Sequence, residues 1–248
     1  RNQCMGAGSP IADVHGYLGA LINGDHVRPG EISQLLRLEL ALDMRQRAAW
    51  AGMLLYVISS IYVCYLAVQS GLEGATWNAL FWIILLFAAF NAVGRSFVRE
   101  DQGRQLYLYT LVHPRSVVLA RSLYNALTMF ALSILSFACY ALFLGTGALE
   151  KADLLQFTLA VVLGGVGFAV VLTLIAAIAA RAGNGIGLMA ILGFPIVLPM
   201  LLLVMRTSQL ALDGSPFSTN ALHFVGIVLL DTITLALAWL LFPYLWRD

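Results

Sequence analysis

The stretch LLQFTLAVVLGGVGFAVVLTLIAAIAA occupies residues 154–180 and contains 27 residues without a single charged side chain. Asp153 precedes it and Arg181 follows it. An α-helix of about 20 apolar residues crosses the hydrocarbon core of a bilayer, so this stretch is long enough. Inside hydrocarbon each backbone amide must find its partner within the segment, which favours a helix. We therefore predict a membrane-spanning helix over these residues.

Five more runs of the same kind lie on either side of this stretch. We expect spans at about residues 48–72, 74–94, 118–146, 184–205 and 220–245, each with at most one charged residue. The strands of a membrane barrel would alternate polar and apolar side chains, and these runs do not alternate. The sequence therefore predicts an all-α integral membrane protein with six spans.

The overall composition agrees with a membrane protein. The chain has 248 residues, of which 60% are hydrophobic and 11% are charged, whereas about a quarter of a soluble domain is charged. The net charge of +1 and the absence of a dense basic run give no reason to expect a nucleic-acid partner. Cys4, Cys64 and Cys139 are scattered and form no CxxC pair, so neither a disulfide framework nor a zinc site is predicted.

The distribution of basic residues predicts the orientation of the spans. With both termini in the cytoplasm, 12 of the 14 basic residues lie on the inner side. They are Arg1, Arg28, Arg37, Arg45, Arg47, Arg95, Arg99, Arg104, Arg115, Arg121, Arg181 and Arg247. Only Lys151 and Arg206 lie on the outer side. Because basic residues accumulate in cytoplasmic loops, we expect cytoplasmic termini.

The N-terminal part of the chain has a different character. Residues 1–30 contain six glycines and two prolines and show no sustained periodicity, so we expect a flexible extension. From about residue 31 an apolar stripe of Ile32, Leu35, Leu36 and Leu40 predicts a short helix on the inner membrane surface. The six-span membrane domain then extends over residues 31–248.

The loop between spans two and three, residues 95–115, is the longest inner loop. Its first half is charged, with Arg99, Glu100, Asp101 and Arg104, and residues 106–112 are apolar and aromatic. Pro114 ends the apolar half. Two interpretations stay open: the arginines only anchor the topology, or the loop docks a cytosolic partner.

Three residues inside the spans stand out. Asp231 lies near the middle of span six, where a carboxylate costs about 2.5–3.5 kcal/mol on insertion scales. It is either part of a gate or relay, or, as we favour, a helix-packing group that bonds to Thr232, Thr234 or a neighbouring span. Pro195 and Pro199 each remove a backbone donor, so span five should be kinked.

The sequence predicts no catalytic machinery in this chain. No GxxxxGK[ST] phosphate loop, GxSxG elbow, HExxH pair or CxxCH haem-attachment site occurs. Of the four histidines, only His223 lies near the outer end of a span, and a single histidine there is more often structural than a ligand. We therefore expect a membrane protein that is not an enzyme.

Three segments resemble a known family. The first is LRLEL at residues 36–40 with RQR at 45–47. The second is FVRE at 97–100, Gly103 and LYLYTLVHP at 106–114, followed by LAR at 119–121 and Asn125. The third is NGIGLMAILGFPIVLP at 184–199. Together they resemble haem exporter protein B (CcmB), the membrane subunit of the cytochrome c maturation ABC transporter, over roughly residues 33–246.

This resemblance implies an ABC-2-exporter-like fold and a permease subunit in the bacterial inner membrane. It implies a cytosolic ATPase partner of CcmA type, a haem-handling membrane protein of CcmC type, a small helper of CcmD type and a periplasmic haem chaperone of CcmE type. Haem is handled by this complex, and the resemblance assigns no cofactor to this chain. ATP hydrolysis would belong to the partner chain.

The resemblance also makes the inner loop the expected coupling element. The residues expected to couple the ATPase are Phe97, Arg99, Glu100, Asp101, Gly103, Arg104, Leu106, Tyr107 and Pro114. Two alternatives stay open: a permease of another ABC-2 exporter, for lipid, polysaccharide or drug, and a membrane scaffold that transports nothing.

Overall fold

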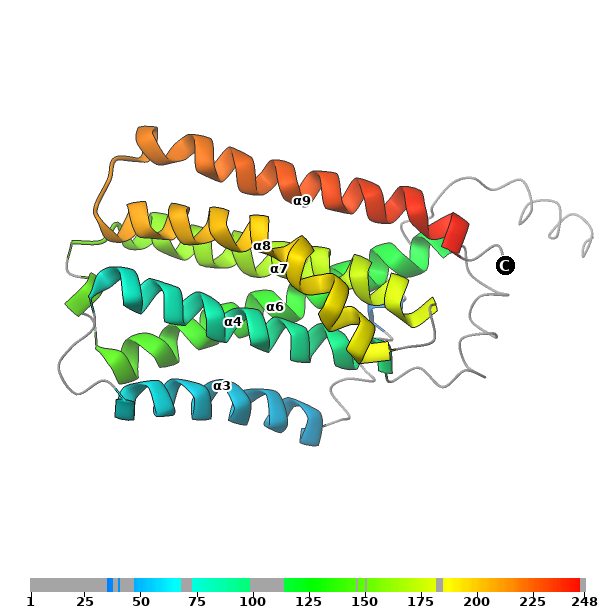
Figure 1. The fold of residues 1–248 in the computed structure, drawn as a ribbon, viewed down its shortest axis with the longest axis horizontal. Helices are drawn as coiled ribbons and strands as arrows, with labels where there is room; N and C mark the ends of the chain where they lie inside the picture. The colour runs from blue at the N-terminus through cyan, green and yellow to red at the C-terminus, as the bar shows by residue number, and fades with distance from the viewer. Residues whose placement is uncertain are drawn as a thin grey trace, which may run out of the picture.

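The computed structural model describes residues 35–37, 40, 47–67, 73–98, 114–145, 147–149, 151–181 and 185–245. These residues form six long α-helices, a short helical piece at residues 35–37 and 40, a single 3₁₀ turn and no strand, which confirms the all-α prediction for this part of the chain. The helices are α3 (Arg47–Ala67), α4 (Gly74–Val98), α6 (Pro114–Leu144), α7 (Leu154–Arg181), α8 (Gly185–Leu212) and α9 (Phe217–Leu245), with the turn η1 at Gly147–Leu149 (Figure 1). All six helices are long and apolar enough to cross a membrane.

The observed helices correspond one to one with the expected spans, and α4, α6, α7, α8 and α9 are longer than expected. Helix α8 continues past Met205 to Leu212, although Arg206 interrupts the apolar run. The Arg206 side chain is exposed, and a long basic side chain can keep its charge at the membrane surface while its stem lies along the helix. Helix α6 begins at Pro114, a position that suits proline because the first helical residue needs no amide donor.

The N-terminal interfacial helix is described only in fragments. Residues 35–37 and 40 are helical. The remainder of residues 31–46, the expected extension over residues 1–30, and residues 68–72 of the first expected span lie outside the described residues.

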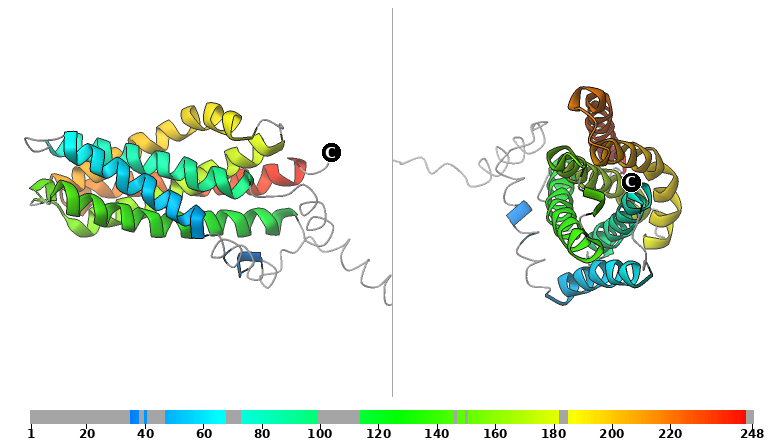
Figure 2. Two further views of the ribbon diagram at one scale, coloured as in Figure 1. Left: turned by 90° about the horizontal axis from the view of Figure 1, so that it is seen from below. Right: turned by 90° about the vertical axis from the view of Figure 1, so that its left-hand side faces the viewer.

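The helices form an elongated bundle in which α4 and α7 are central. Of the residues in their membrane-length windows, 67% in α4 and 72% in α7 are buried, against 17% in α3 and in α9. The end-on view shows α3 and α9 on opposite sides of the bundle (Figure 2). Side chains of α3 and α9 therefore face outward for most of their length, as expected for helices that contact lipid.

The two ends of the bundle carry different groups and are named here after one residue each. The Asp153 end holds the first residues of α4, α7 and α9 and the last residues of α3, α6 and α8 (left in Figure 1). The Arg181 end is the opposite one. Near the Asp153 end, buried aromatic rings of Trp77, Phe81, Tyr140 and Phe157 contact one another, with Trp77 and Tyr140 4.8 Å apart and edge to face.

Helix α7 occupies the centre because it approaches its neighbours closely. A Cβ atom added at Gly164 would lie 2.5 Å from the ring of Trp82 in α4 and 2.9 Å from Val204 in α8. Gly165 lies against Ser133 of α6, and Gly167 lies against Met200 of α8 and Asp231 of α9. Small residues at such crossings let transmembrane helices pack backbone to backbone. Three glycines within four positions thus bring four helices around α7.

Candidate functional site

The expected coupling loop is described only where it joins its two helices. Phe97 belongs to the last turn of α4, and Pro114 is the first residue of α6. Arg99, Glu100, Asp101, Gly103, Arg104, Leu106 and Tyr107 lie outside the described residues. The structure therefore establishes which helices hold the loop and leaves its own contacts as a prediction.

Helix α4, from which the loop departs, touches most of the bundle. It packs against α3, α6, α7 and α8, four of the other five long helices. Its buried residues include Trp82, Leu85, Ala89 and Val93, which are all fully or almost fully enclosed. A displacement of α4 along or across its axis would therefore disturb the whole bundle.

Pro195 and Pro199 both lie inside α8, near the middle of this 28-residue helix. Each lacks the amide that would bond the carbonyl four residues earlier. Figure 1 shows that α8 changes direction between its two halves. Both prolines are exposed on the surface of the bundle, away from its core.

Asp231 lies at the crossing of α9 with α7 and α8. A Cβ atom at Gly167 of α7 would lie 2.5 Å from Oδ1 of Asp231, and the same glycine contacts Met200 of α8. This oxygen is buried and has no hydrogen-bond partner among the described residues. Thr232 and Thr234 donate instead to carbonyls of their own helix, those of Val228 and Leu230. Of the partners that the sequence favoured, Thr232, Thr234 or a neighbouring span, the two threonines therefore do not donate to Asp231.

A cluster of four buried polar side chains and one exposed carboxylate near the Asp153 end was not predicted. We call Asn78, Asp153, Gln156, Ser208 and Asn220 the polar clamp. Asn78 of α4 donates to the carbonyl of Met205 in α8 (2.9 Å), and Ser208 Oγ donates to Oδ1 of Asn78 (2.8 Å). The indole nitrogen of Trp82 donates to Ser208 Oγ (2.7 Å). These bonds fasten α4 to α8.

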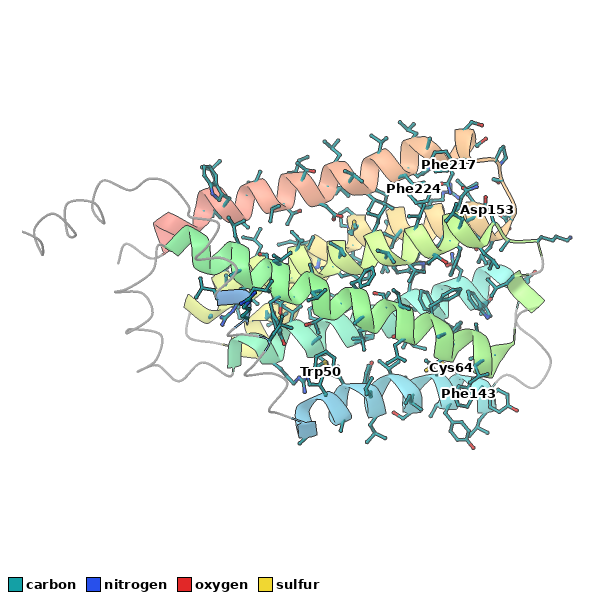
Figure 3. All side chains as sticks on the ribbon, turned by 180° about the vertical axis from the view of Figure 1, so that it is seen from behind. Trp50, Cys64, Phe143, Asp153, Phe217 and Phe224 are labelled. Carbon is teal, nitrogen blue, oxygen red and sulfur yellow. The ribbon has the colours of Figure 1, made fainter. Side chains whose placement is uncertain are left out.

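Asp153 begins α7 as its N-terminal cap. Its carboxylate accepts from the backbone amides of Leu155 and Gln156, both at 3.1 Å, and from the side-chain amide of Gln156 at 2.8 Å. A carboxylate here satisfies amides that the first helical turn leaves unpaired. These hydrogen bonds hold the pKa of Asp153 below its ordinary value. The side-chain N–H of Gln156 has the largest effect, followed by the backbone N–H of Gln156, and the backbone N–H of Leu155 adds to them. Figure 3 shows Asp153 at the same end as Phe217 and Phe224 of α9.

Gln156 and Asn220 extend the polar clamp from α7 to α8 and α9. Gln156 also donates to the carbonyl of Ser215 in the α8–α9 connection (3.0 Å). Asn220 of α9 donates to Gln156 Oε1 (3.2 Å) and to the carbonyl of Thr207 in α8 (3.0 Å). Asn78, Gln156, Ser208 and Asn220 are at most 3% exposed. Four helices thus meet through hydrogen bonds at one end of the bundle.

The turn that follows α8 completes this end. Gly214 adopts a φ of 68°, and a Cβ atom there would lie 2.6 Å from the carbonyl oxygen of Lys151. Only glycine combines this left-handed conformation with so close an approach. The amide of Ser215 then bonds the carbonyl of Leu210 (3.0 Å), and that of Asp153 bonds the carbonyl of Ala211 (2.9 Å). The α6–α7 connection is therefore bonded to the last turn of α8 and packs closely against Gly214 of the α8–α9 connection.

The arrangement offers helix contacts and no recognisable reaction centre. Among the described residues, no three His, Cys, Asp or Glu side chains lie close enough to hold a metal ion. His223 of α9 is half-buried, and its Nδ1 atom has no partner among these residues. Asn78, Gln156, Ser208 and Asn220 do have partners, and these join one helix to another. Fold and site together define a multi-pass helical membrane protein whose interior polar groups hold its helices together.

Comparison with known proteins identifies the family. A family model described as CcmB protein matches residues 31–241, which is most of the chain. The chain belongs to the CcmB family, the membrane component of the ABC transporter for haem export and cytochrome c maturation. The sequence matches none of the curated proteins. The family implies a complex with an ATPase and other Ccm proteins, in which this chain is the non-catalytic membrane subunit.

Proposed function

We propose that this chain is the transmembrane permease subunit that couples a separate ATPase of CcmA type to the release of a haem-loaded periplasmic chaperone of CcmE type. The family match carries this proposal. No phosphate-binding loop occurs within the 248 residues, so nucleotide binding falls to the partner. The haem-handling membrane protein of CcmC type and the small CcmD-type helper complete the assembly. Haem is handled by this complex, with no cofactor assigned to this chain.

The proposed orientation places the Arg181 end in the cytoplasm of a bacterial cell. Arg95, Arg121 and Arg181 lie at this end of α4, α6 and α7, whereas Glu73, Lys151, Asp153 and Asp213 lie at the other. Basic residues accumulate on the cytoplasmic side of spans in the inner membrane. Both termini and the loop that follows α4 then face the compartment that contains ATP.

The coupling element in this proposal is the loop between α4 and α6. An ATPase can drive this chain only by binding two of its conformations with different affinity. Contact with Arg99, Glu100, Asp101 and Arg104 would supply orientation through charge, and Leu106 and Tyr107 would supply apolar contact. The packing of α4 against four other helices supports this assignment, because force applied to the loop reaches them through α4.

Reversal of the charges at Arg99 and Glu100 tests the proposal. The double variant Arg99→Glu with Glu100→Arg keeps the net charge. We expect six inserted spans, loss of the co-purified ATPase and loss of c-type cytochromes. The measurements are recovery of the ATPase with the tagged variant and haem staining of cell proteins.

A matched control reverses two charges at the other end of the bundle. Glu73→Arg with Lys151→Glu also keeps the net charge, and both side chains are exposed. We expect this variant to retain the ATPase and the cytochromes. If the Arg99/Glu100 variant recovers the ATPase and makes c-type cytochromes normally, the loop does not couple the ATPase and its arginines only fix the orientation of the spans. ATPase binding without any change in its hydrolysis rate would favour a scaffold over a permease.

A further inference from the structure

The two halves of α8 are held by different kinds of contact. Residues 185–205 contain no side chain with a nitrogen or oxygen atom. All the hydrogen-bonding side chains of this helix lie beyond them, and those of Thr207, Ser208 and Gln209 all make bonds. The polar clamp therefore fastens only the part of α8 near the Asp153 end. The half near the Arg181 end, residues 185–194, is held by apolar packing.

That apolar packing joins residues 185–194 to α4 and, at Gly193, also to Leu172 of α7. Phe194 stacks on Phe90 of α4 with ring centres 6.2 Å apart and lies 6.3 Å from Phe87. A Cβ atom at Gly193 would lie 2.9 Å from the Phe90 ring, so the two helices nearly touch there. Met189 approaches Gly94 one turn further along, with its sulfur 3.7 Å from the Cβ position. The same two helices are thus bonded at one end and packed at the other.

Pro195 and Pro199 separate these two halves. The two missing amides leave carbonyls without their helical partner, and helices bend at such sites. On the Asp153 side of the prolines, Met200 and Val204 lie tightly against Gly167 and Gly164 of α7. On the Arg181 side, Ile191 and Phe194 are 72% and 45% exposed. Among the described residues, the hydrogen bonds of the polar clamp therefore restrain α8 only on the Asp153 side of the prolines.

We propose that residues 185–194 of α8 and the adjoining part of α4 move together about a hinge at Pro195–Pro199, while the polar clamp holds the Asp153 end still. Phe90, Gly193 and Phe194 form the contact that transmits the movement. This inference rests on the proposed function for its driving force, since the loop that would receive the ATPase continues directly from α4. The hinge itself rests on the contacts of α8.

Distances between spin labels test the hinge. One pair, at Ile191 of α8 and Leu123 of α6, reports the Arg181-side half, and both residues face outward. Helix α6 is a fixed reference there because Asn125 donates to Thr173 of α7 (2.9 Å). The control pair, at Leu202 of α8 and Leu142 of α6, reports the clamped half. The labels are placed in a variant without its native cysteines.

We expect the Ile191–Leu123 distance distribution of the chain in lipid nanodiscs to be broader than the Leu202–Leu142 distribution. In the complex, ATP should shift the first distance and leave the second unchanged. Pro195→Ala with Pro199→Ala restores both amides, so it should narrow the first distribution and abolish the ATP-dependent shift. The ATPase should still co-purify with this double variant. The cells should nevertheless lack c-type cytochromes, because the hinge no longer moves.

Phe194→Ala is a second variant that keeps the prolines and removes the stacked contact with α4. It should broaden the Ile191–Leu123 distribution, abolish the ATP-dependent shift and retain the bound ATPase. Equal widths for the two pairs, unaltered by either variant, would overturn the hinge. Failure of the proposed function gives a different result, because the ATPase would then not bind even the wild-type chain. The Ile191–Leu123 distance distribution, measured without the ATPase, would still be broader than the Leu202–Leu142 distribution.

Discussion

At the scale of single residues, a few amides and one carboxylate organise the Asp153 end of the bundle. Each buried hydrogen bond contributes about 0.5–1.5 kcal/mol, and bonds between transmembrane helices average about 0.6 kcal/mol. The side chain of Asn220 in α9 donates one hydrogen bond to α7 and another to α8. Because its neighbours are buried as well, no water replaces a lost bond there. Polar residues inside these spans therefore act as fasteners.

Asp153 should make the stability of the bundle depend on pH. Its pKa is lowered in the folded chain, so its stabilising contribution is present above its ordinary pKa of about 4 and is lost as the pH falls below that value. We expect Asp153→Asn to melt at a temperature that depends less on pH than the wild type between about pH 6 and pH 3. Thermal unfolding in detergent measures this difference. Parallel pH profiles of the two proteins would contradict it.

Asp231→Asn should leave the chain at least as stable as the wild type. The substitution keeps the volume that Gly167 and Met200 enclose, and it removes a charge that costs about 2.5–3.5 kcal/mol on insertion scales. Oδ1 of Asp231 has no hydrogen-bond partner among the described residues, so the substitution leaves no donor unpaired at that atom. Thermal unfolding and c-type haem staining are compared with Glu73→Gln, an exposed control. Normal stability with lost cytochromes would show that the carboxylate belongs to a gate or relay.

At the scale of elements, α7 is the helix on which the others are arranged. Its three glycines face different neighbours because each residue of a helix turns by about 100°. Gly164 faces α4 and α8, Gly165 faces α6, and Gly167 faces α8 and α9. Close contact on three sides explains why the most apolar span is also the most buried.

Gly164→Ala should destabilise the bundle by about 1–3 kcal/mol, because the added methyl group would overlap the Trp82 ring in a site without free space. Gly52→Ala in α3 is the matched control. No heavy atom lies within 4 Å of the added methyl group there, and alanine favours a helix over glycine by about 0.5–1 kcal/mol. The melting temperature should fall for the first variant and not for the second. Equal melting temperatures would mean that Trp82 moves aside freely.

The sequence predicted the number and positions of the long helices well, because span length depends only on bilayer thickness and hydrophobicity. It did not predict the polar clamp. The signal was present: Asn78, Gln156 and Asn220 each lie close to the start of an apolar run, and Asp153 with Gln156 has the spacing of a capping pair. Their partners include backbone carbonyls of other helices, and a single sequence does not reveal which helices adjoin.

At the scale of the whole molecule, α4 and α8 are held together differently at the two ends of the bundle. Side-chain hydrogen bonds join them at the Asp153 end, and apolar side chains pack between them at the Arg181 end. Among the described residues, the hydrogen bonds of the polar clamp lie at the Asp153 end, where the α6–α7 connection also bonds to the last turn of α8. In the predicted topology, the other end has 12 of the 14 basic residues and the loop expected to meet the ATPase. This division fits a subunit that is anchored on one side of the membrane and driven from the other.

The orientation of that division is testable by labelling. In a cysteine-free variant, single cysteines at Gln102 and Asp213 should react with an impermeant reagent from opposite sides of the membrane. Gln102 belongs to the loop after α4, and Asp213 is exposed at the end of α8. Asp213 should label in intact spheroplasts, and Gln102 only in inverted vesicles. Labelling of Gln102 in spheroplasts would invert the proposed topology.

The hydrogen bond between Asn78 and Ser208 joins positions 130 residues apart and has a consequence for synthesis of the chain. Ribosomes add about 5–20 residues per second, so α4 waits on the order of ten seconds before its partner emerges. During this interval Ser208 Oγ, which later donates to Oδ1 of Asn78 and accepts from the indole nitrogen of Trp82, is not yet available to these two side chains of α4. The nascent protein must therefore spend that time in the membrane as a loose set of helices. Insertion is complete span by span, whereas closure of the bundle comes only near the end of translation.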